Sequence, residues 1–242
     1  MKTALVTGGA SGLGLGLVEL LSKRGYAVAL LDLDDDAGQT AAKAFGAWYY
    51  HVDVSDHTAM QSTVSKVVAD LGTPERVFLN AGVMSRPQSA PIDDDPLDWL
   101  LQSCERVVNV NMYGPLYGLH ALAPLLAKAG GGDVVVTSSV AGISPLAFDP
   151  YYAMSKHALI GMVRSFAPVL EPQRIRLNAF CPGLMRTQIV PDALKHMDNG
   201  MSGLQAAETC YDISATQSSG KIWVREGFRQ TLKEYVMPEL DI

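Results

Sequence analysis

Residues 134–157 read VVVTSSVAGISPLAFDPYYAMSKH, and this stretch decides both the expected fold and the expected chemistry. Its opening run of valines is typical of a buried strand, and a loop rich in glycine and proline leads to a helix that begins near Tyr151. On that helix Tyr152 and Lys156 are four residues apart, so their side chains lie on the same face. Ser139 follows the strand, and the return of the loop can bring it to the same point.

The spacing of Tyr152 and Lys156 predicts a group that transfers protons. A free phenol has a pKa of about 10, and a neighbouring ammonium lowers that pKa into the range of a useful general acid or base. With the hydroxyl of Ser139, the stretch predicts a site that moves a proton on or off an alcohol or carbonyl oxygen. Such a pair in isolation is more often an amphipathic tyrosine beside a solvated lysine, so the surrounding motifs decide between the two interpretations.

Short apolar runs alternate with longer amphipathic segments along most of the chain. Strands that are apolar on both faces and separated by helices indicate right-handed βαβ units and a parallel sheet covered on both sides. We therefore predict one α/β domain over residues 1–242, a Rossmann-type doubly wound parallel sheet of about seven strands with helices on both faces. The expected strands are Thr3–Thr7, Ala27–Leu31, Ala47–Val52, Val77–Leu79, Val134–Thr137, Ile175–Phe180 and Lys221–Val224. The expected helices are Gly12–Lys23, Ala37–Phe45, His57–Leu71, Leu97–Lys128 (one long or two joined) and Tyr151–Leu170.

The composition argues against several classes of function. Hydrophobic residues make up 48% and charged residues 18% of the 242, which indicates a folded core rather than disorder. The net charge of −6, from 25 acidic and 19 basic residues, recommends neither nucleic acid nor an anionic membrane as a partner. No acidic or cysteine cluster has the spacing of a metal site, so we expect no metal.

The three cysteines and the uncharged segments predict the compartment. Cys104, Cys181 and Cys210 are widely separated, which favours a reducing compartment, and Cys181 is expected to be a buried, inert thiol. The sequence contains no secretory leader pattern and no apolar stretch long enough to span a bilayer. We therefore expect a soluble cytoplasmic protein.

A glycine-rich turn follows the first expected strand, where residues 7–14 read TGGASGLG. Glycines 8, 12 and 14 permit a tight turn, close approach of the backbone to a pyrophosphate and close packing of helix on strand, while the helix N-terminus attracts phosphate charge. The spacing differs from GxGxxG, and glycine-rich turns also occur for purely structural reasons. Because this turn lies directly between the first strand and the first helix, it predicts a dinucleotide site.

Acidic residues after the next two strands fit the adenosine half of a dinucleotide. Asp32 can accept hydrogen bonds from both ribose hydroxyls and would repel a 2′-phosphate, and Ser11 adds no positive charge to the turn, so NAD is favoured over NADP. Asp53 is placed to meet the adenine amine, and Val54 to cover the ring. Alternatively, Asp32 only starts the next turn and Asp53 caps the following helix.

Three further stretches bear on the same edge of the sheet. The sequence NAG at 80–82 follows the fourth strand, where small residues leave room for a cofactor and Asn80 can brace the backbone. Pro-Gly at 182–183 follows the sixth strand, and the Thr187 hydroxyl either holds a nicotinamide carboxamide or caps a helix. Asn111 lies inside an expected helix, where asparagine is unfavourable, so it either makes a required hydrogen bond or lies on an exposed face.

In this combination the sequence resembles the short-chain dehydrogenase/reductase family, in its NAD-preferring branch. The matching segments are TGGASGLG at 7–14, Asp32, Asp53-Val54, NAG at 80–82, Asn111, Ser139, YAMSK at 152–156, and Pro-Gly at 182–183 with Thr187. In the family the serine lies thirteen positions before the tyrosine, which selects Ser139 over Ser138. The spacing to Lys156 likewise selects Tyr152 over Tyr151, which is expected to line the pocket.

The resemblance implies a role for each catalytic residue. Tyr152 protonates a carbonyl during reduction or deprotonates an alcohol during oxidation, and Lys156 lowers the pKa of that phenol and holds the nicotinamide ribose. Ser139 hydrogen-bonds the substrate oxygen, and Asn111 holds a water that links Lys156 to solvent. The expected cofactor contacts are Gly8, Ser11, Gly12, Leu13, Gly14, Asp32, Asp53, Val54, Asn80, Ala81, Gly82, Tyr152, Lys156, Pro182, Gly183 and Thr187. The expected substrate-pocket residues are Ser139, Val140, Tyr151, Tyr152 and Met185.

The resemblance is weaker beyond Thr187. Residues 187–219 are expected to be a looser region that either covers a hydrophobic substrate as a lid or packs as ordinary helices. The apolar residues available to such a lid are Met185, Ile189, Val190, Leu194, Met197, Met201 and Leu204. Residues 218–236 suggest the last strand, then a charged helix and a short tail. The resemblance also implies a homodimer or homotetramer that pairs through the helices at 97–128 and 151–170.

The leading hypothesis is an NAD(H)-dependent oxidoreductase that interconverts a secondary alcohol and its ketone on an apolar or cyclic small molecule. One alternative is an NADPH-dependent carbonyl reductase, which needs a cation for the 2′-phosphate, and no well-placed Arg or Lys is evident. Another is a non-catalytic dinucleotide-sensing protein of the same fold. Such proteins usually lack a catalytic residue, and none is missing here.

Overall fold

The structure is a computed structural model, and it describes residues 2–86, 89, 100–186 and 200–238. Eight strands form one sheet in the order β3-β2-β1-β4-β5-β6-β7-β8, in which every neighbouring pair is parallel except β7 and β8. The strands are β1 (Thr3–Thr7), β2 (Ala27–Asp32), β3 (Trp48–His51), β4 (Arg76–Leu79), β5 (Gly132–Thr137), β6 (Ile175–Pro182), β7 (Ile222–Arg225) and β8 (Lys233–Glu234). The predicted single-domain, doubly wound α/β fold is confirmed.

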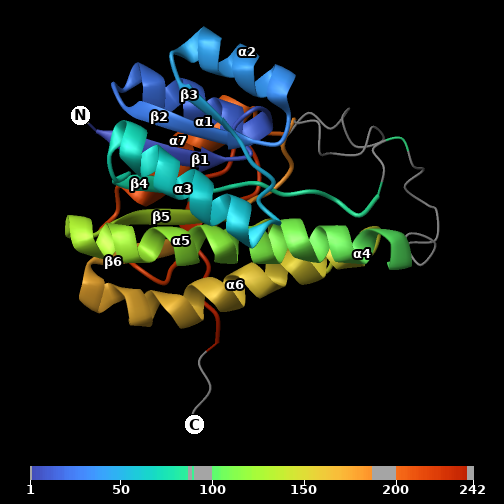
Figure 1. Cartoon of the computed structure of the whole chain (residues 1–242). Coiled ribbons are helices and arrows are strands. Elements are labelled where there is room, and N and C mark those ends of the chain that lie inside the picture. The colour runs from blue at the N-terminus through green and yellow to red at the C-terminus, as the bar shows by residue number, and fades with distance from the viewer. Residues whose placement is uncertain (1, 87–88, 90–99, 187–199, 239–242) are drawn as a thin grey trace.

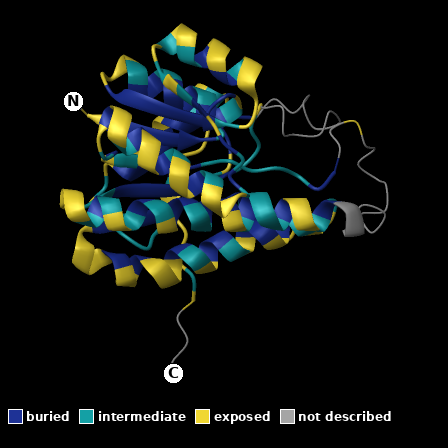
Figure 2. Ribbon diagram, viewed as in Figure 1, coloured by how far each residue is buried: buried dark blue, intermediate teal, exposed yellow. Residues whose placement is uncertain are grey.

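Helices cover both faces of the sheet (Figure 1). One layer contains α1, α2 and α7, and the other contains α3, α5 and α6. The buried residues of these two sets of helices accordingly form two separate apolar clusters, one on each face of the sheet. The helices are α1 (Gly12–Lys23), α2 (Asp35–Phe45), α3 (His57–Leu71), α4 (Leu100–Val108), α5 (Gly114–Ala129), α6 (Pro150–Leu170) and α7 (Gly203–Ser214). Figure 2 shows the buried sheet between helices whose outer faces are exposed.

Strand β1 shows why most strand residues are apolar. Successive side chains of a strand point to opposite faces. Leu5 therefore packs in the layer of α3, α5 and α6, while Ala4 and Val6 pack in the layer of α1, α2 and α7. All five residues of β1 are buried. A strand covered on both sides cannot alternate between apolar and polar residues, which is why this pattern predicts a parallel sheet.

The winding of the chain reverses at β1, which pairs with β2 on one side and with β4 on the other. The chains that leave β1 and β4 continue to helices on opposite faces of the sheet, and ligands of open α/β sheets bind in the crevice between them. Gly8 and Ala81 meet there, because a Cβ atom added to Gly8 would lie 2.8 Å from the Cα atom of Ala81. The fold therefore places the glycine turn and the NAG segment side by side.

The region expected as one long or two joined helices at 97–128 is divided by a π-helix. Within the described residues, α4 ends at Val108, a π-helical segment spans Asn109–Tyr113, and α5 follows. Pro115 has no N–H to donate to the carbonyl of Asn111, so the α-helical pattern breaks there. The wider turn holds Asn111, and such turns often occur at functional sites.

The structure corrects two expectations for the C-terminal part. The charged helix expected after the last strand is wrong: the short strand β8 pairs antiparallel with β7 and forms the edge of the sheet. Of the looser region expected at 187–219, residues 187–199 lie outside the described part, and the rest contains the regular helix α7. Its buried face is made of small residues such as Ala206 and Ala207, so its apolar pattern is weak in the sequence. Ser202 and Gln205 form a capping box that fixes its start.

None of the helices in the described residues is long and apolar enough to cross a membrane. The three cysteines are free thiols, and Cys181 and Cys210 are buried.

Candidate active site

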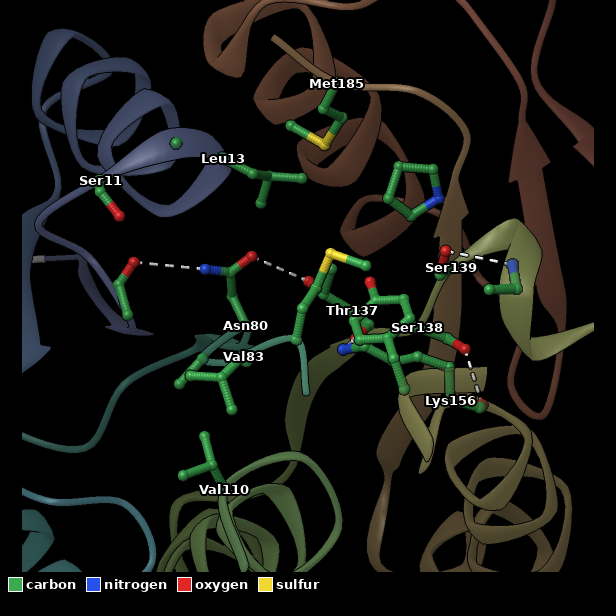
Figure 3. Close-up of a pocket in the computed structure, with 18 of the residues that line it drawn as sticks. Ser11, Leu13, Asn80, Val83, Val110, Thr137, Ser138, Ser139, Lys156 and Met185 are labelled. Atoms are coloured by element: carbon green, nitrogen blue, oxygen red, sulfur yellow. Dashed lines mark hydrogen bonds between the residues drawn. The ribbon is translucent and has the colours of Figure 1, made fainter. Parts of the chain in front are cut away.

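A cavity of about 500 Å³ opens at the carboxyl ends of the strands, between the glycine turn and the start of α6 (Figure 3). Most of the predicted site residues line it: Gly8, Ser11, Gly12, Leu13, Asp32, Asp53, Val54, Asn80, Ala81, Gly82, Ser139, Val140, Tyr152, Lys156, Pro182, Gly183 and Met185. Residues far apart in the sequence are thus brought to one site.

Several residues of the cavity wall were not foreseen. They are Leu33, Val52, Val83, Met84, Val110, Thr137, Ser138, Ala141, Leu146, Phe148 and Leu184. Most are apolar residues that lie next to a predicted site residue in the sequence. Only this adjacency could have indicated that they line the cavity. Leu146 and Phe148, in the loop before α6, give the part of the cavity near Tyr152 its apolar character.

Four predicted residues are not in the described cavity wall. Gly14 and Asn111 act from behind it, through contacts given below. The expectation that Tyr151 lines the pocket is not met: Tyr151 is not part of the described cavity wall, and its phenol lies near the thiol of Cys104. Thr187 lies outside the described residues, as do four of the seven residues considered for a lid. Of the other three, Met185 lines the cavity, Met201 is in the core and Leu204 is exposed.

The glycine turn leaves backbone donors open to the cavity. Gly8 and Gly12 have φ angles of 64° and 54°, in the left-handed region that favours glycine. A Cβ atom on Gly14 would lie 1.9 Å from the carbonyl oxygen of Gly8, so only glycine fits there. Ser11 is the N-cap residue of α1, but its side chain makes no capping hydrogen bond. The first N–H groups of α1 therefore remain available, as a bound phosphate would require.

The Asp32 carboxylate closes the turn from the β2 side. It accepts hydrogen bonds from the backbone N–H of Ala10 at 2.9 Å and of Asp34 at 3.1 Å. These bonds fix the carboxylate at the edge of the cavity, half-buried. The bond from Asp34 agrees with the alternative that Asp32 only starts the next turn. The bond from Ala10, however, also connects Asp32 to the glycine turn.

Asp53 is held at the end of the next strand by its own turn. Its carboxylate accepts from the backbone N–H of Ser55 at 2.9 Å and from the Ser55 hydroxyl at 2.6 Å. The alternative that Asp53 caps α3 is wrong, because the cap is Asp56, whose side chain accepts from Ala59. Asp53 and the buried Val54 thus remain available to the cavity.

The Asn80 side chain braces the strands on both sides, as predicted. Its amide donates to the carbonyls of Thr7 at 3.2 Å and Gly8 at 3.3 Å, and it accepts from the Thr137 hydroxyl at 3.2 Å. A single side chain therefore links β1, β4 and β5 beneath the cavity. Figure 3 shows Asn80 and Thr137 together on its floor.

Asn111 is fully buried, which decides between its two interpretations in favour of a hydrogen-bonding role. Its side chain accepts from the N–H of Val83 at 2.8 Å, donates to the carbonyl of Val83 at 2.8 Å, and donates to the Ser155 hydroxyl at 3.0 Å. Ser155 in turn donates to the carbonyl of Tyr152 at 2.7 Å. The π-helix is thereby joined to the segment after β4 and to α6.

Ser139, Tyr152 and Lys156 meet at one end of the cavity. Ser139 follows β5, and its hydroxyl lies close enough to the phenol of Tyr152 to lower the pKa of that phenol. The Lys156 ammonium lies 5.5 Å from the centroid of the Tyr152 ring and donates to the carbonyl of Thr137 at 2.9 Å. Gly82 makes room for it, since a Cβ atom there would lie 3.2 Å from the ammonium nitrogen.

Burial dominates the proton affinities at this site. Burial raises the pKa of Tyr152 to about 12, against the opposing effect of the Ser139 hydrogen bond, and burial lowers the pKa of Lys156 to about 8. The expectation that Lys156 lowers the pKa of Tyr152 is therefore not met in the chain alone, because the ammonium is bonded to Thr137 rather than to the phenol. The phenol is protonated near neutrality. Burial also raises the pKa of the Cys181 thiol to about 11, in keeping with an inert cysteine.

The low pKa of Lys156 gives a testable dependence of stability on pH. Between about pH 8 and 10.5 the folded chain binds fewer protons at Lys156 than the unfolded chain does, so the free energy of unfolding rises with pH in this range. Below pH 8 the buried charge of Lys156 destabilises the folded chain in full, and this destabilisation decreases as the pH rises. Replacing Lys156 with methionine should therefore stabilise the chain more at pH 7 than at pH 10, by about 2 kcal/mol in urea unfolding. Lys128→Met, which removes an exposed ammonium, is the control. A Lys156→Met gain that is equal at both pH values would contradict the assignment.

Sequence comparison matches residues 2–198 to a family described as short chain dehydrogenase. The chain belongs to the short-chain dehydrogenase family. It is accordingly an oxidoreductase of the kind that uses a nicotinamide dinucleotide. The glycine turn with open N–H groups, the fixed Asp32 and the Lys156 ammonium fit such a cofactor.

Curated relatives of this short-chain dehydrogenase include three with informative names. Secoisolariciresinol dehydrogenase of Forsythia intermedia is 32% identical over 93% of this chain and 79% of its own length. A 2,5-dichloro-2,5-cyclohexadiene-1,4-diol dehydrogenase of Sphingobium indicum is 32% identical over 82% of this chain and 77% of its own. The human 15-hydroxyprostaglandin dehydrogenase [NAD(+)] is 31% identical over 82% and 74%. All three relatives are named as dehydrogenases.

Solved structures reproduce the fold. Levodione reductase superimposes with a TM-score of 0.82 at 23% identity, over 93% of this chain and 96% of that one. A structure described as ribose-5-phosphate isomerase from Brucella melitensis 16M also gives a TM-score of 0.82 at 23% identity, over 94% and 92%. At this identity the likeness concerns the fold alone.

Proposed function

We propose that this short-chain dehydrogenase is an NAD(H)-dependent oxidoreductase that interconverts a secondary alcohol and its ketone. The observation that carries the proposal is the meeting of Ser139, Tyr152 and Lys156 at one end of a cavity whose other end is the glycine turn. A bound nicotinamide dinucleotide would supply the hydride acceptor or donor. The chain itself would supply the proton and the groups that orient both molecules.

Each of the three residues has one task in this proposal. Tyr152 gives its proton to a carbonyl oxygen during reduction, and its high pKa keeps that proton in place near neutrality. The Ser139 hydroxyl hydrogen-bonds the same oxygen and stabilises charge that develops there. Lys156 holds the ribose of the cofactor, from a position fixed by the carbonyl of Thr137. Alcohol oxidation needs the phenolate and should therefore be faster at alkaline pH.

The preference for NAD rests on the charge of Asp32. Among the residues that line the described cavity, Lys156 is the sole Lys or Arg, and it lies at the other end from Asp32. A 2′-phosphate near Asp32 would meet a fixed carboxylate and no counter-charge from the lining residues.

Replacing Asp32 with asparagine tests this preference. The amide keeps the shape and an acceptor oxygen but removes the charge, so we expect the ratio of kcat/KM for NAD to that for NADP to fall about tenfold, equivalent to about 1.4 kcal/mol. Asp36→Asn makes the same change at an exposed position of α2 and is the control. An unaltered protein that uses both cofactors equally would refute the assignment.

We propose an apolar or cyclic substrate because the cavity wall near Tyr152 is apolar. Leu146, Phe148, Met84 and Met185 line it. One relative supports a ring-bearing alcohol in particular, because its name specifies a cyclohexadiene diol.

The direct experiment is a panel of secondary alcohols and ketones, cyclic and open-chain, offered with NAD(H) and NADP(H) in both directions. Reduced nicotinamide is followed by its absorbance. Turnover of at least one cyclic alcohol with NAD supports the proposal. Turnover with NADPH alone supports the carbonyl reductase alternative, and tight dinucleotide binding without turnover of any member supports the sensing protein.

We further propose that the chain acts as a homodimer or homotetramer in the cytoplasm. Tyr113 in the π-helix and Phe166 and Val169 on α6 are 42%, 39% and 64% exposed, which supports pairing through these helices.

A further inference from the structure

A buried carboxylate lies three residues before the catalytic tyrosine. Asp149 is fully buried and is the N-cap of α6, where its carboxylate accepts from the backbone N–H of Tyr152 at 3.0 Å. The same carboxylate accepts from the backbone N–H of Ser85 at 3.0 Å and from the Ser85 hydroxyl. One side chain thus bonds the helix that carries Tyr152 and a segment 64 residues away.

Capping alone does not account for this burial. Asp34 and Asp56 cap α2 and α3 in the same way, each accepting from a backbone N–H three residues on, and both are exposed. Burying a carboxylate is costly unless it is fully hydrogen-bonded. The bonds from Ser85 offset that cost for Asp149, so the long-range tie is the distinguishing feature of this cap.

A second contact joins the same two segments. Arg86 is 6% exposed, and its guanidinium donates to the carbonyl of Phe148 at 3.0 Å. Ser85 and Arg86 therefore hold Asp149 and Phe148, and we call these four residues the clasp. Phe148 also lines the cavity, so the clasp lies directly behind its wall.

The clasp connects the tyrosine to the wall of the cofactor cavity. The chain leaves β4 through Gly82, Val83 and Met84, which line the cavity, and then enters the clasp at Ser85. Asn111 ties Val83 to Ser155, one turn further along α6. The start of α6 is thus fixed to this segment both before and after Tyr152.

We infer that Asp149 is a positioning residue, which sets the distance between the Tyr152 hydroxyl and the cavity wall formed by residues 82–84. This inference rests on the proposed function. Because proton transfer depends steeply on the placement of the reacting atoms, loosening the clasp should slow turnover even where the dinucleotide still binds.

The charge of Asp149 has an effect separate from its position. It adds to the high pKa of Tyr152, whose main cause is burial and which Cys181 also raises, while Ser139 lowers it. Lys156 faces the same ring, and Arg86 lies beside Asp149. Removing the charge should lower the pKa of Tyr152, so alcohol oxidation should reach its maximum at lower pH. Loss of a helix cap alone would not move that profile.

Three substitutions separate these effects. Asp149→Ser keeps a hydroxyl to cap α6 but cannot hold Ser85, Ser85→Ala removes one bond from the other side, and Asp149→Asn removes the charge. The control Asp56→Ser makes the same change at the equivalent exposed cap of α3. The assay uses the most active alcohol of the panel, with kcat, KM for alcohol and dinucleotide, pH profile and thermal midpoint measured for each variant.

We expect Asp149→Ser to lower kcat about tenfold to a hundredfold and Ser85→Ala about threefold to tenfold, with the KM for the dinucleotide changed less than about threefold. Asp149→Asn should move the oxidation profile to lower pH. Asp56→Ser keeps a capping oxygen and should leave kcat, the pH profile and the thermal midpoint near those of the unaltered protein. If Asp149→Ser does not fold, the kcat of Ser85→Ala and the pH profile of Asp149→Asn test the inference in its place. Normal kcat and an unmoved profile in those two variants overturn the inference. A Tyr152→Phe variant that retains turnover overturns the proposed function instead.

Discussion

Replacing Tyr152 with phenylalanine is expected to abolish turnover while leaving the dinucleotide bound. The substitution removes one oxygen, which is the proposed proton donor and acceptor, and a positioned acid or base of this kind contributes about a hundredfold to ten-thousandfold to a rate. We expect kcat to fall by about a thousandfold. The measurements are steady-state turnover and titration of NADH binding by fluorescence.

The neighbouring tyrosine provides a matched control for that change. Tyr151→Phe removes the same atom from the adjacent residue, which is not part of the described cavity wall. Its kcat should remain near that of the unaltered protein. If both variants retain turnover, Tyr152 has no part in the reaction. If Tyr152→Phe also loses dinucleotide binding, its effect is structural.

Replacing Gly14 with alanine is expected to disrupt the dinucleotide site from behind. The added Cβ atom would lie 1.9 Å from the carbonyl oxygen of Gly8 and 2.8 Å from the side-chain nitrogen of Asn80, so the glycine turn or α1 must shift. Overpacking of this kind costs about 1–3 kcal/mol or more. We expect a lower midpoint of urea unfolding and, because Gly8 lines the cavity, a loss of NAD affinity on the order of a hundredfold.

Gly161→Ala controls for the change of glycine to alanine in a helix. Gly161 lies on the exposed face of α6, and an added Cβ atom would meet nothing within 4 Å. Alanine is the better helix former by about 1 kcal/mol, so this variant should be slightly more stable and should bind NAD normally. Equal behaviour of the two variants would show that the turn tolerates a side chain at position 14.

The strands and most helices were predictable because their signals are local. Strands buried on both faces are apolar at most positions, and the helices between them show one apolar face. The segments that were missed carry weak or competing local signals. The buried face of α7 combines Ile213 with alanine, cysteine and small polar residues, and β8 is two charged residues whose strand conformation depends on pairing with β7. The pairing with β7, rather than the residues of β8 themselves, therefore determines that β8 is a strand.

The order of motifs along the chain determined the family resemblance, the glycine turn, and the pairing of Tyr152 with Lys156, because these depend on residue type and spacing. Only the tertiary structure decided their surroundings. Folding buries the Lys156 ammonium, half-buries Tyr152, directs Lys156 to the carbonyl of Thr137 and leaves Tyr151 outside the described cavity wall. It also brings Ser85 to Asp149. Proton affinity and contacts between distant segments depend on burial and neighbours in space, and a linear sequence does not contain either.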